Sequence, residues 1–303
     1  MCGIVGLLIK RESLRTSLGE MLAPMLGCMG ERGPDSAGLA VFGETLNGDT
    51  PREARHFSLF SPDAGIDWTA LRERFTGDNA ISAEVKSTDN NAVLTADCAP
   101  GAFEDWLGAA FPRLHLRSVG RSIRMYKDVG APRSLVARYR VGEVAGSHAV
   151  GHTRMATESA VSPAHAHPFT AGEDFCLVHN GSLSNPHSLR RALERRGIRF
   201  QTDNDTEAAC RFLEWRMSVG DTLEQALERG FDELDGFYTL LMATADRMVL
   251  VRDPFACKPA VVAETDDYVA VASEFRSLAH LPGVDTARLF EPNPETIYSW
   301  SVK

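Results

Sequence analysis

The sequence predicts an α+β protein in which helices cover two β-sheets and a smaller α+β unit is inserted into the chain. Short apolar runs typical of buried strands recur in both halves, and amphipathic helical stretches precede and separate them. Residues from about 70 to 145 follow a strand–strand–helix–strand order, which suits a separate small unit. We therefore expect one domain over residues 1–303, interrupted by an inserted α+β subdomain at about 70–145.

The individual elements follow from local pattern. Residues 43 to about 62 are polar and rich in Gly, Pro and Asp, as in a connecting loop. Before this loop we expect a strand at 2–9, a helix at 13–29 and a strand at 38–42. In the inserted unit we expect strands at 80–87 and 92–96, a helix at 100–111 and one or two strands within 114–127. Beyond it we expect strands at 149–152 and 175–178, helices at 187–196 and 205–217, and strands at 237–244, 248–252, 260–263 and 268–272.

The composition, 44% apolar and 24% charged residues, is that of an ordinary globular protein and excludes a disordered tail, a collagen-like repeat and a disulfide miniprotein. Lys and Arg number 32 against 41 Asp and Glu, and the net charge of −9 argues against a nucleic-acid partner. The early apolar run at 2–9 is much shorter than the about 20 residues of a membrane span, so no membrane partner is expected. Because the six cysteines form no Cys-x-x-Cys pair and no signal peptide is visible, we expect free thiols, no metal site and a cytoplasmic location.

Cys2 is a candidate nucleophile. Removal of Met1 would leave a cysteine that carries both a thiol and a free α-amine. An α-amine has a pKa of about 7.7–8.0, so a fraction of it is unprotonated at neutral pH and can accept the thiol proton. The alternative is an ordinary buried cysteine at the start of a strand.

Asn180 and Gly181 follow an apolar strand and are candidates for an oxyanion hole. The side-chain amide of Asn180 and the backbone N–H of Gly181 can both donate to the negative oxygen of a tetrahedral intermediate. The alternative is a hairpin turn, for which Asn-Gly is a common sequence.

Arg154 and Asp205 are candidates for binding a free α-amino acid. Arg154 follows a predicted strand, and a guanidinium group can hold a carboxylate through two hydrogen bonds. Asp205 begins a predicted helix and can accept hydrogen bonds from an ammonium group. Asp is also a favoured N-cap residue, which is the alternative for Asp205.

The order of these residues and their flanking sequence resemble the class II, N-terminal-nucleophile glutamine amidotransferases. Matching blocks occur in family order over nearly the whole chain outside residues ~50–145. The blocks are Cys2-Gly3-Ile4-Val5-Gly6, Arg32-Gly33-Pro34-Asp35-Ser36-Ala37-Gly38, Gly151-His152-Thr153-Arg154-Met155-Ala156-Thr157, Ala166-His167-Pro168-Phe169, His179-Asn180-Gly181, Thr202-Asp203-Asn204-Asp205-Thr206-Glu207, Asp235-Gly236, Arg252-Asp253-Pro254 and Ala272-Ser273-Glu274-Phe275.

The resemblance implies a four-layer α/β/β/α fold and hydrolysis of L-glutamine to glutamate and ammonia. It implies that Cys2 forms an acyl-thioester, with its own α-amine as general base, and that Asn180 and Gly181 supply the oxyanion hole. Arg32 and His167 are implied as supporting residues near the nucleophile.

The same resemblance assigns the α-carboxylate of glutamine to Arg154, assisted by Thr157, and the α-ammonium group to Asp205. The sequence departs from many relatives directly after Thr157. Glu158 and Ser159 stand where those relatives carry a histidine or a glycine-rich stretch.

The resemblance also bears on partners. The chain is most similar to the amidotransferase-like subunit of glutamate-synthase-related complexes, such as the first subunit of N-methylglutamate synthase in methylamine metabolism. This implies synthase-type partner subunits that hold any flavin or iron–sulfur cluster, with no cofactor in this chain. Two alternatives stay open: a non-catalytic subunit used for assembly or glutamine sensing, and a hydrolase of another amide.

Overall fold

The computed structural model describes residues 2–43, 53–156 and 160–302, which contain three antiparallel sheets. The order of strands in the seven-stranded sheet is β15 (Arg288–Phe290), β13 (Val261–Glu264), β14 (Tyr268–Ala272), β1 (Gly3–Ile9), β8 (His148–Arg154), β2 (Ser36–Phe42) and β7 (Arg124–Val129). The five-stranded sheet has the order β16 (Tyr298–Ser301), β12 (Arg247–Arg252), β11 (Gly236–Ala243), β10 (Cys176–Leu183) and β9 (Phe169–Thr170). The four-stranded sheet has the order β4 (Ala83–Thr88), β5 (Asn91–Ala96), β3 (Arg55–Phe60) and β6 (His115–Gly120).

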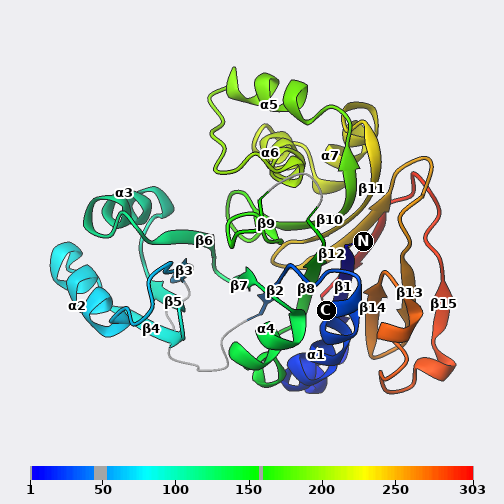
Figure 1. Cartoon of the computed structure of the whole chain (residues 1–303), viewed down its shortest axis with the longest axis horizontal. Helices are drawn as coiled ribbons and strands as arrows, with labels where there is room; N and C mark the ends of the chain where they lie inside the picture. The colour runs from blue at the N-terminus through cyan, green and yellow to red at the C-terminus, as the bar shows by residue number, and fades with distance from the viewer. Residues whose placement is uncertain (1, 44–52, 157–159, 303) are drawn as a thin grey trace.

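Helices cover the outer faces of the two larger sheets, on opposite sides of the body (Figure 1). The seven-stranded sheet is covered by α1 (Leu18–Cys28) and α4 (Pro132–Arg138). The five-stranded sheet is covered by α5 (Pro186–Glu194), α6 (Asp205–Ser218) and α7 (Leu223–Glu233). In the four-stranded sheet, α2 (Trp68–Asn79) and α3 (Pro100–Ala110) close a small core of their own.

Strand alternation explains the layers, because successive side chains of a strand point to opposite faces of the sheet. In β1, Val5, Leu7 and Ile9 pack under α1, whereas Ile4 and Leu8 pack against the other large sheet. Because both faces of β1 are buried, its sequence is a continuous run of apolar residues. The expected four-layer α/β/β/α fold is confirmed.

The inserted unit, defined here as residues 55–120, has different limits from the expected 70–145. β3 lies inside the stretch expected to be a connecting loop, because its polar residues His56 and Ser58 are buried and hide the strand pattern. At the other end, β7 pairs with β2 of the seven-stranded sheet and α4 packs beside α1, so residues 124–138 belong to the main body. Local pattern shows that a strand is present but not which sheet it joins.

Several elements were not expected from sequence: α2, α4, α7, β9, β15 and β16. For α7 a usable signal exists, since Thr222 and Gln225 form a capping box at its start. The others are short or have weak apolar periodicity. Within the three described stretches, no helix is both long and apolar enough to cross a membrane.

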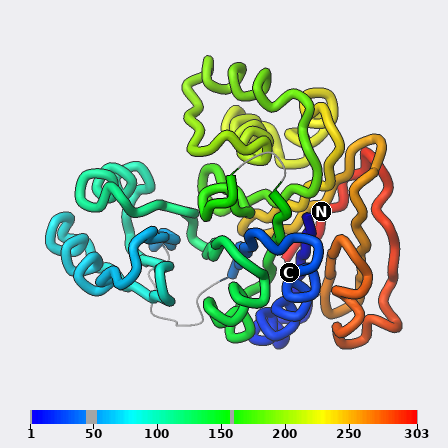
Figure 2. The backbone as a smooth tube through the Cα atoms, in the orientation of Figure 1, coloured from blue at the N-terminus to red at the C-terminus, as the bar shows by residue number. Residues whose placement is uncertain are grey.

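Polar contacts fasten the inserted unit to the body. The backbone N–H of Asp174, in the loop before β10, donates to the carbonyl oxygen of Val119 at 3.0 Å, and its carboxylate accepts from the backbone N–H groups of residues 121–123, directly after the unit, at 2.9 Å each. On the other side, Asn91 donates to the hydroxyl of Tyr139 at 2.8 Å. The tube in Figure 2 shows the inserted unit to one side, while the amino end lies in the middle of the two-sheet body.

Candidate functional site

The first side of the site is formed by the start of β1 and the end of β8. These strands are antiparallel, with Gly3 opposite Thr153 and Ile4 opposite His152. Because Ile4 faces the other large sheet, Arg154, two residues beyond His152, faces it as well. Cys2 lies beside this strand end, with its Sγ 3.7 Å from the carbonyl oxygen of Met155.

The second side is the end of β10 in the five-stranded sheet. Cys176 and Val178 belong to the core between the sheets, so Asn180 points into the same space. A hydrogen bond of 3.0 Å between Nε2 of His152 and the carbonyl oxygen of His179 joins the two sheets at this end. The fold therefore brings Cys2, Arg154 and Asn180 to one end of the inter-sheet space.

Asn180 and Gly181 do not form a hairpin turn. Both lie within β10 and pair with Thr239 and Tyr238 of β11. Gly181 has φ +150°, and a Cβ placed on it would overlap the carbonyl oxygen of Phe237, so only glycine fits. Nδ2 of Asn180 is buried and has no hydrogen-bond partner in the described part of the chain.

Asp205 is not the N-cap of α6. Asn204 fills that position, and its side chain accepts a hydrogen bond from the backbone N–H of Thr206. Oδ2 of Asp205 instead accepts from the backbone N–H of Leu183 at 2.9 Å, which ties the helix to the end of β10. Its Oδ1 lies 3.8 Å from Nδ1 of His179. The capping alternative is therefore wrong, and the carboxylate lies beside the strand that carries Asn180.

Arg32 holds the start of the chain in place. Its Nε donates to the carbonyl oxygen of Cys2 at 3.0 Å, and its Nη1 donates to Glu274 at 2.6 Å. The hydrogen bond from this guanidinium group holds the pKa of Glu274 below its ordinary value. Glu274 was not singled out from the sequence, although it lies in a block that matches the family.

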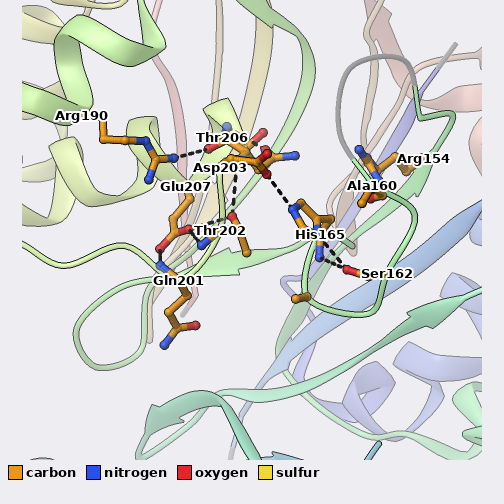
Figure 3. Close-up of polar contacts among 12 residues, drawn as sticks. Arg154, Ala160, Ser162, His165, Arg190, Gln201, Thr202, Asp203, Thr206 and Glu207 are labelled. Carbon is orange, nitrogen blue, oxygen red and sulfur yellow. Dashed lines mark hydrogen bonds and ion pairs between the residues drawn. The ribbon is translucent and has the colours of Figure 1, made fainter.

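Arg154 and the residues that follow it make contacts with nearby segments. Nη1 of Arg154 donates to the carbonyl oxygen of Ala160 at 3.0 Å, and the backbone N–H of Ala156 donates to Asp35 at 2.8 Å. Further along, His165 contacts Asp203 at 2.7 Å, which joins the loop to the segment before α6 (Figure 3). Thr157, expected to assist Arg154, lies outside the described residues.

His167 lies among buried polar groups rather than at Cys2 itself. Its Nε2 is 2.7 Å from Oγ1 of Thr206, and its ring packs on His152 with centroids 4.0 Å apart. The same hydroxyl of Thr206 contacts Nδ1 of His179 at 3.0 Å. His167 thus connects β8 with the start of α6, next to Asp205.

Several of the buried polar atoms without partners lie at this end of the sheets, and others are spread over the rest of the described chain. Such atoms are rare in folded proteins and call for a specific explanation, such as a site for a ligand. Within the described ranges they include Nη2 of Arg32, Nδ1 of His152, Nδ1 of His167, Nε2 of His179 and Nδ2 of Asn180. The described stretches contain no group of three or more His, Cys, Asp or Glu side chains placed to hold a metal ion.

Burial lowers the pKa of several histidines, with a consequence for stability. The pKa of His148 falls to about 4 and that of His152 to about 3, and that of His56 falls to about 4, in each case mainly through desolvation. Between about pH 6.5 and 4 these histidines stay neutral when folded but bind protons when unfolded. Folding therefore loses stability as the pH falls through this window.

We expect the free energy of unfolding to drop by about 1.4 kcal/mol per pH unit for each such histidine in this window. Urea unfolding at pH 7.5, 6.0 and 5.0 measures the slope. His148→Gln and His56→Gln should each reduce the slope, because each removes a histidine whose pKa burial lowers. A free energy that stays constant from pH 7.5 to 5.0 would contradict the expectation.

Comparison with known proteins agrees with this geometry. A family model described as a glutamine amidotransferase domain matches residues 152–280. Over 301 residues the chain is 47% identical to the glutamine amidotransferase-like protein GlxB of Rhizobium meliloti (strain 1021), covering 99% of this chain and 98% of that protein. It is also 30% identical over 173 residues to a glutamine–fructose-6-phosphate aminotransferase (isomerizing) of Shewanella oneidensis, covering 54% of this chain and 28% of that enzyme.

Among solved structures, the fold matches the glutamine phosphoribosylpyrophosphate amidotransferase of B. subtilis, complexed with ADP and GMP, with a TM-score of 0.60 and 19% identity. The match covers 99% of this chain and 49% of that structure, so this chain spans about half of its length. Fold, motif order and full-length similarity agree. The chain belongs to the class II, N-terminal-nucleophile glutamine amidotransferase family, and it is an enzyme of that type.

Proposed function

We propose that this protein hydrolyses L-glutamine to glutamate and ammonia through a thioester on Cys2. The observation that carries the proposal is the buried, unpartnered Nδ2 of Asn180, which faces the space beside Cys2. Leaving a buried donor unpaired costs about 1–3 kcal/mol, and a developing oxyanion would supply its missing acceptor.

The reaction follows from the groups at the site. The α-amine of Cys2, freed by removal of Met1, accepts the thiol proton, and the thiolate attacks the carboxamide carbon of glutamine. Nδ2 of Asn180 and the backbone N–H of Gly181 stabilise the resulting oxyanion. Collapse of the intermediate breaks the C–N bond, and the protonated amine returns its proton to the departing ammonia. Water then attacks the thioester and releases glutamate and the thiol.

The charged groups of the site suit the two ends of a free amino acid. Arg154 would hold the α-carboxylate, with help from Thr157, and Asp205 would accept from the α-ammonium group. Arg154 is buried, so its interaction with a carboxylate is little screened by solvent. The hydrogen bonds of Arg32 to Cys2 and Glu274 would keep the nucleophile in position.

The ammonia needs an acceptor reaction, which we assign to partner subunits. The motif at residues 32–38 resembles that of amidotransferase-like subunits in glutamate-synthase-related complexes, and N-methylglutamate synthase is the complex we propose. Flavin and iron–sulfur clusters would then lie on the partners, and the assembly would work in the cytoplasm without a cofactor in this chain.

Intact mass spectrometry with the glutamine analogue 6-diazo-5-oxo-norleucine tests the glutaminase proposal. We expect loss of Met1 and a single adduct, mapped to Cys2, that excess L-glutamine suppresses. Cys257→Ala is the matched control, because Cys257 is an exposed thiol that the reagent could reach without the site, and its loss should not change the labelling of Cys2. A processed chain that gains no adduct, alone or with its partners, would favour the non-catalytic alternative.

A further inference from the structure

A buried lysine lies in the same inter-sheet layer as the site. Lys127 on β7 is opposite Gly38, and Gly38 is opposite His152, which in turn is opposite Ile4. Residues directly opposite each other share a face, so Lys127 points into the space between the two large sheets. The side chain of Lys127 is buried. Burying its amino group costs free energy unless the group forms hydrogen bonds inside the protein.

Those partners are backbone carbonyls of one segment. Nζ of Lys127 is 2.8 Å from the oxygen of Ala166, 3.0 Å from that of Pro168 and 3.4 Å from that of Ala164. It also lies 4.7 Å from the centre of the Phe169 ring. No carboxylate forms a hydrogen bond with Nζ in the described part of the chain. The hydrogen bonds of Lys127 therefore stabilise the backbone conformation of residues 164–168.

Gly38 allows this segment to pack closely against β2. A Cβ on Gly38 would overlap the carbonyl oxygen of His167, so the segment lies directly against β2 between Lys127 and His152. Gly38 and Lys127 both act on the position of residues 164–168. One allows the close approach, and the other holds the carbonyls.

The segment also holds the start of α6. His165 contacts Asp203 at 2.7 Å (Figure 3). In addition, His167 contacts Thr206 at 2.7 Å. These two contacts flank Asp205, the acceptor assigned to the α-ammonium group of glutamine. A continuous set of contacts therefore runs from Lys127 through residues 164–168 to Asp205.

We propose that Lys127 is a positioning residue for glutamine binding: it fixes residues 164–168, which fix Asp205 through His165 and His167. This inference rests on the proposed glutaminase function for its kinetic consequence, whereas its structural consequence is independent of that function. Lys127 does not touch the reacting atoms, so its effect should fall on binding rather than on the nucleophile.

The test compares Lys127→Met, which shortens the unbranched side chain by one atom and removes its donors, with Lys86→Met at an exposed position of β4. We expect the KM for L-glutamine to rise at least about tenfold in Lys127→Met, because the hydrogen bonds of Nζ to the carbonyls of residues 164–168 are lost, with kcat within about twofold of the wild type. Lys86→Met should match the wild type. The rate of Cys2 alkylation by iodoacetamide, which needs no amino-acid pocket, should not change.

A second readout does not depend on turnover. Amide hydrogen exchange in residues 164–170 and 203–207 should speed up in Lys127→Met and remain slow in Lys86→Met. An unchanged KM, or unchanged exchange in both segments, overturns the proposal. If the wild type shows no glutaminase activity, the proposed function fails, and the exchange data still decide whether Lys127 holds the segment.

Lys127→Gln provides a second, milder variant in case Lys127→Met does not fold. Its amide keeps two N–H donors at a shorter reach, so we expect exchange rates and KM between those of the wild type and Lys127→Met. Wild-type values in Lys127→Gln together with a folded, unaffected Lys127→Met would contradict the positioning role.

Discussion

Replacing Cys2 with alanine should lower kcat for glutamine hydrolysis by at least about 10⁴-fold, the scale seen when an enzyme loses its covalent nucleophile. We expect no other described thiol to take its place, because the remaining cysteines lie elsewhere in the fold: Cys28 in α1, Cys98 before α3, Cys176 in β10, Cys210 in α6 and Cys257 between β12 and β13. Alanine is small enough to keep processing of Met1 unchanged. A coupled assay for glutamate measures the loss, and thermal unfolding checks that the variant is folded.

A matched variant separates the thiol of Cys2 from its amine. A short extension ahead of Cys2 that is not removed leaves the thiol in place but converts the α-amine into an amide, which cannot act as a base. We expect this protein to lose hydrolysis while the thiol still reacts slowly with iodoacetamide. Full activity in the extended protein would show that another group takes the thiol proton, and full activity in Cys2→Ala would remove the thioester mechanism.

Replacing Asn180 with leucine should lower kcat by about 10²–10³-fold, the cost of losing one oxyanion donor. The two side chains have nearly the same shape, so KM for glutamine should change little. Because Nδ2 of Asn180 has no partner in the described stretches, its removal breaks no hydrogen bond of that atom. The free energy of unfolding should therefore stay within about 1 kcal/mol of the wild type.

Steady-state kinetics and urea unfolding on the same preparations test this separation of activity from stability. Asn79→Ala is the control, because Asn79 caps the end of α2 in the inserted unit through the carbonyl of Phe75. It should affect stability modestly and activity not at all. A large loss of stability in Asn180→Leu, or an unchanged kcat, would show that Asn180 is structural.

Much of the fold was accessible from sequence because its strands are buried on both faces. Continuous apolar runs such as residues 2–9 and 268–272 predict buried strands, and the structure has β1 and β14 there. The family was also accessible, since its motifs occur in order. The inserted unit was recognised but misplaced at both ends, because sheet membership depends on pairing between distant residues such as those of β2 and β7.

For the candidate site, too, some features follow from the sequence motifs and others only from the tertiary contacts. The order of the motifs is enough to select the chemical types of the site, namely a thiol at Cys2, a guanidinium at Arg154 and a carboxylate at Asp205. The three-dimensional arrangement was needed to show that Asp205 is not the helix cap and that Asn180 lies within a strand, with a donor that has no partner in the described residues. It also revealed Glu274 and Lys127. Their roles arise from hydrogen bonds between residues tens to hundreds of positions apart, and local sequence pattern does not encode such contacts.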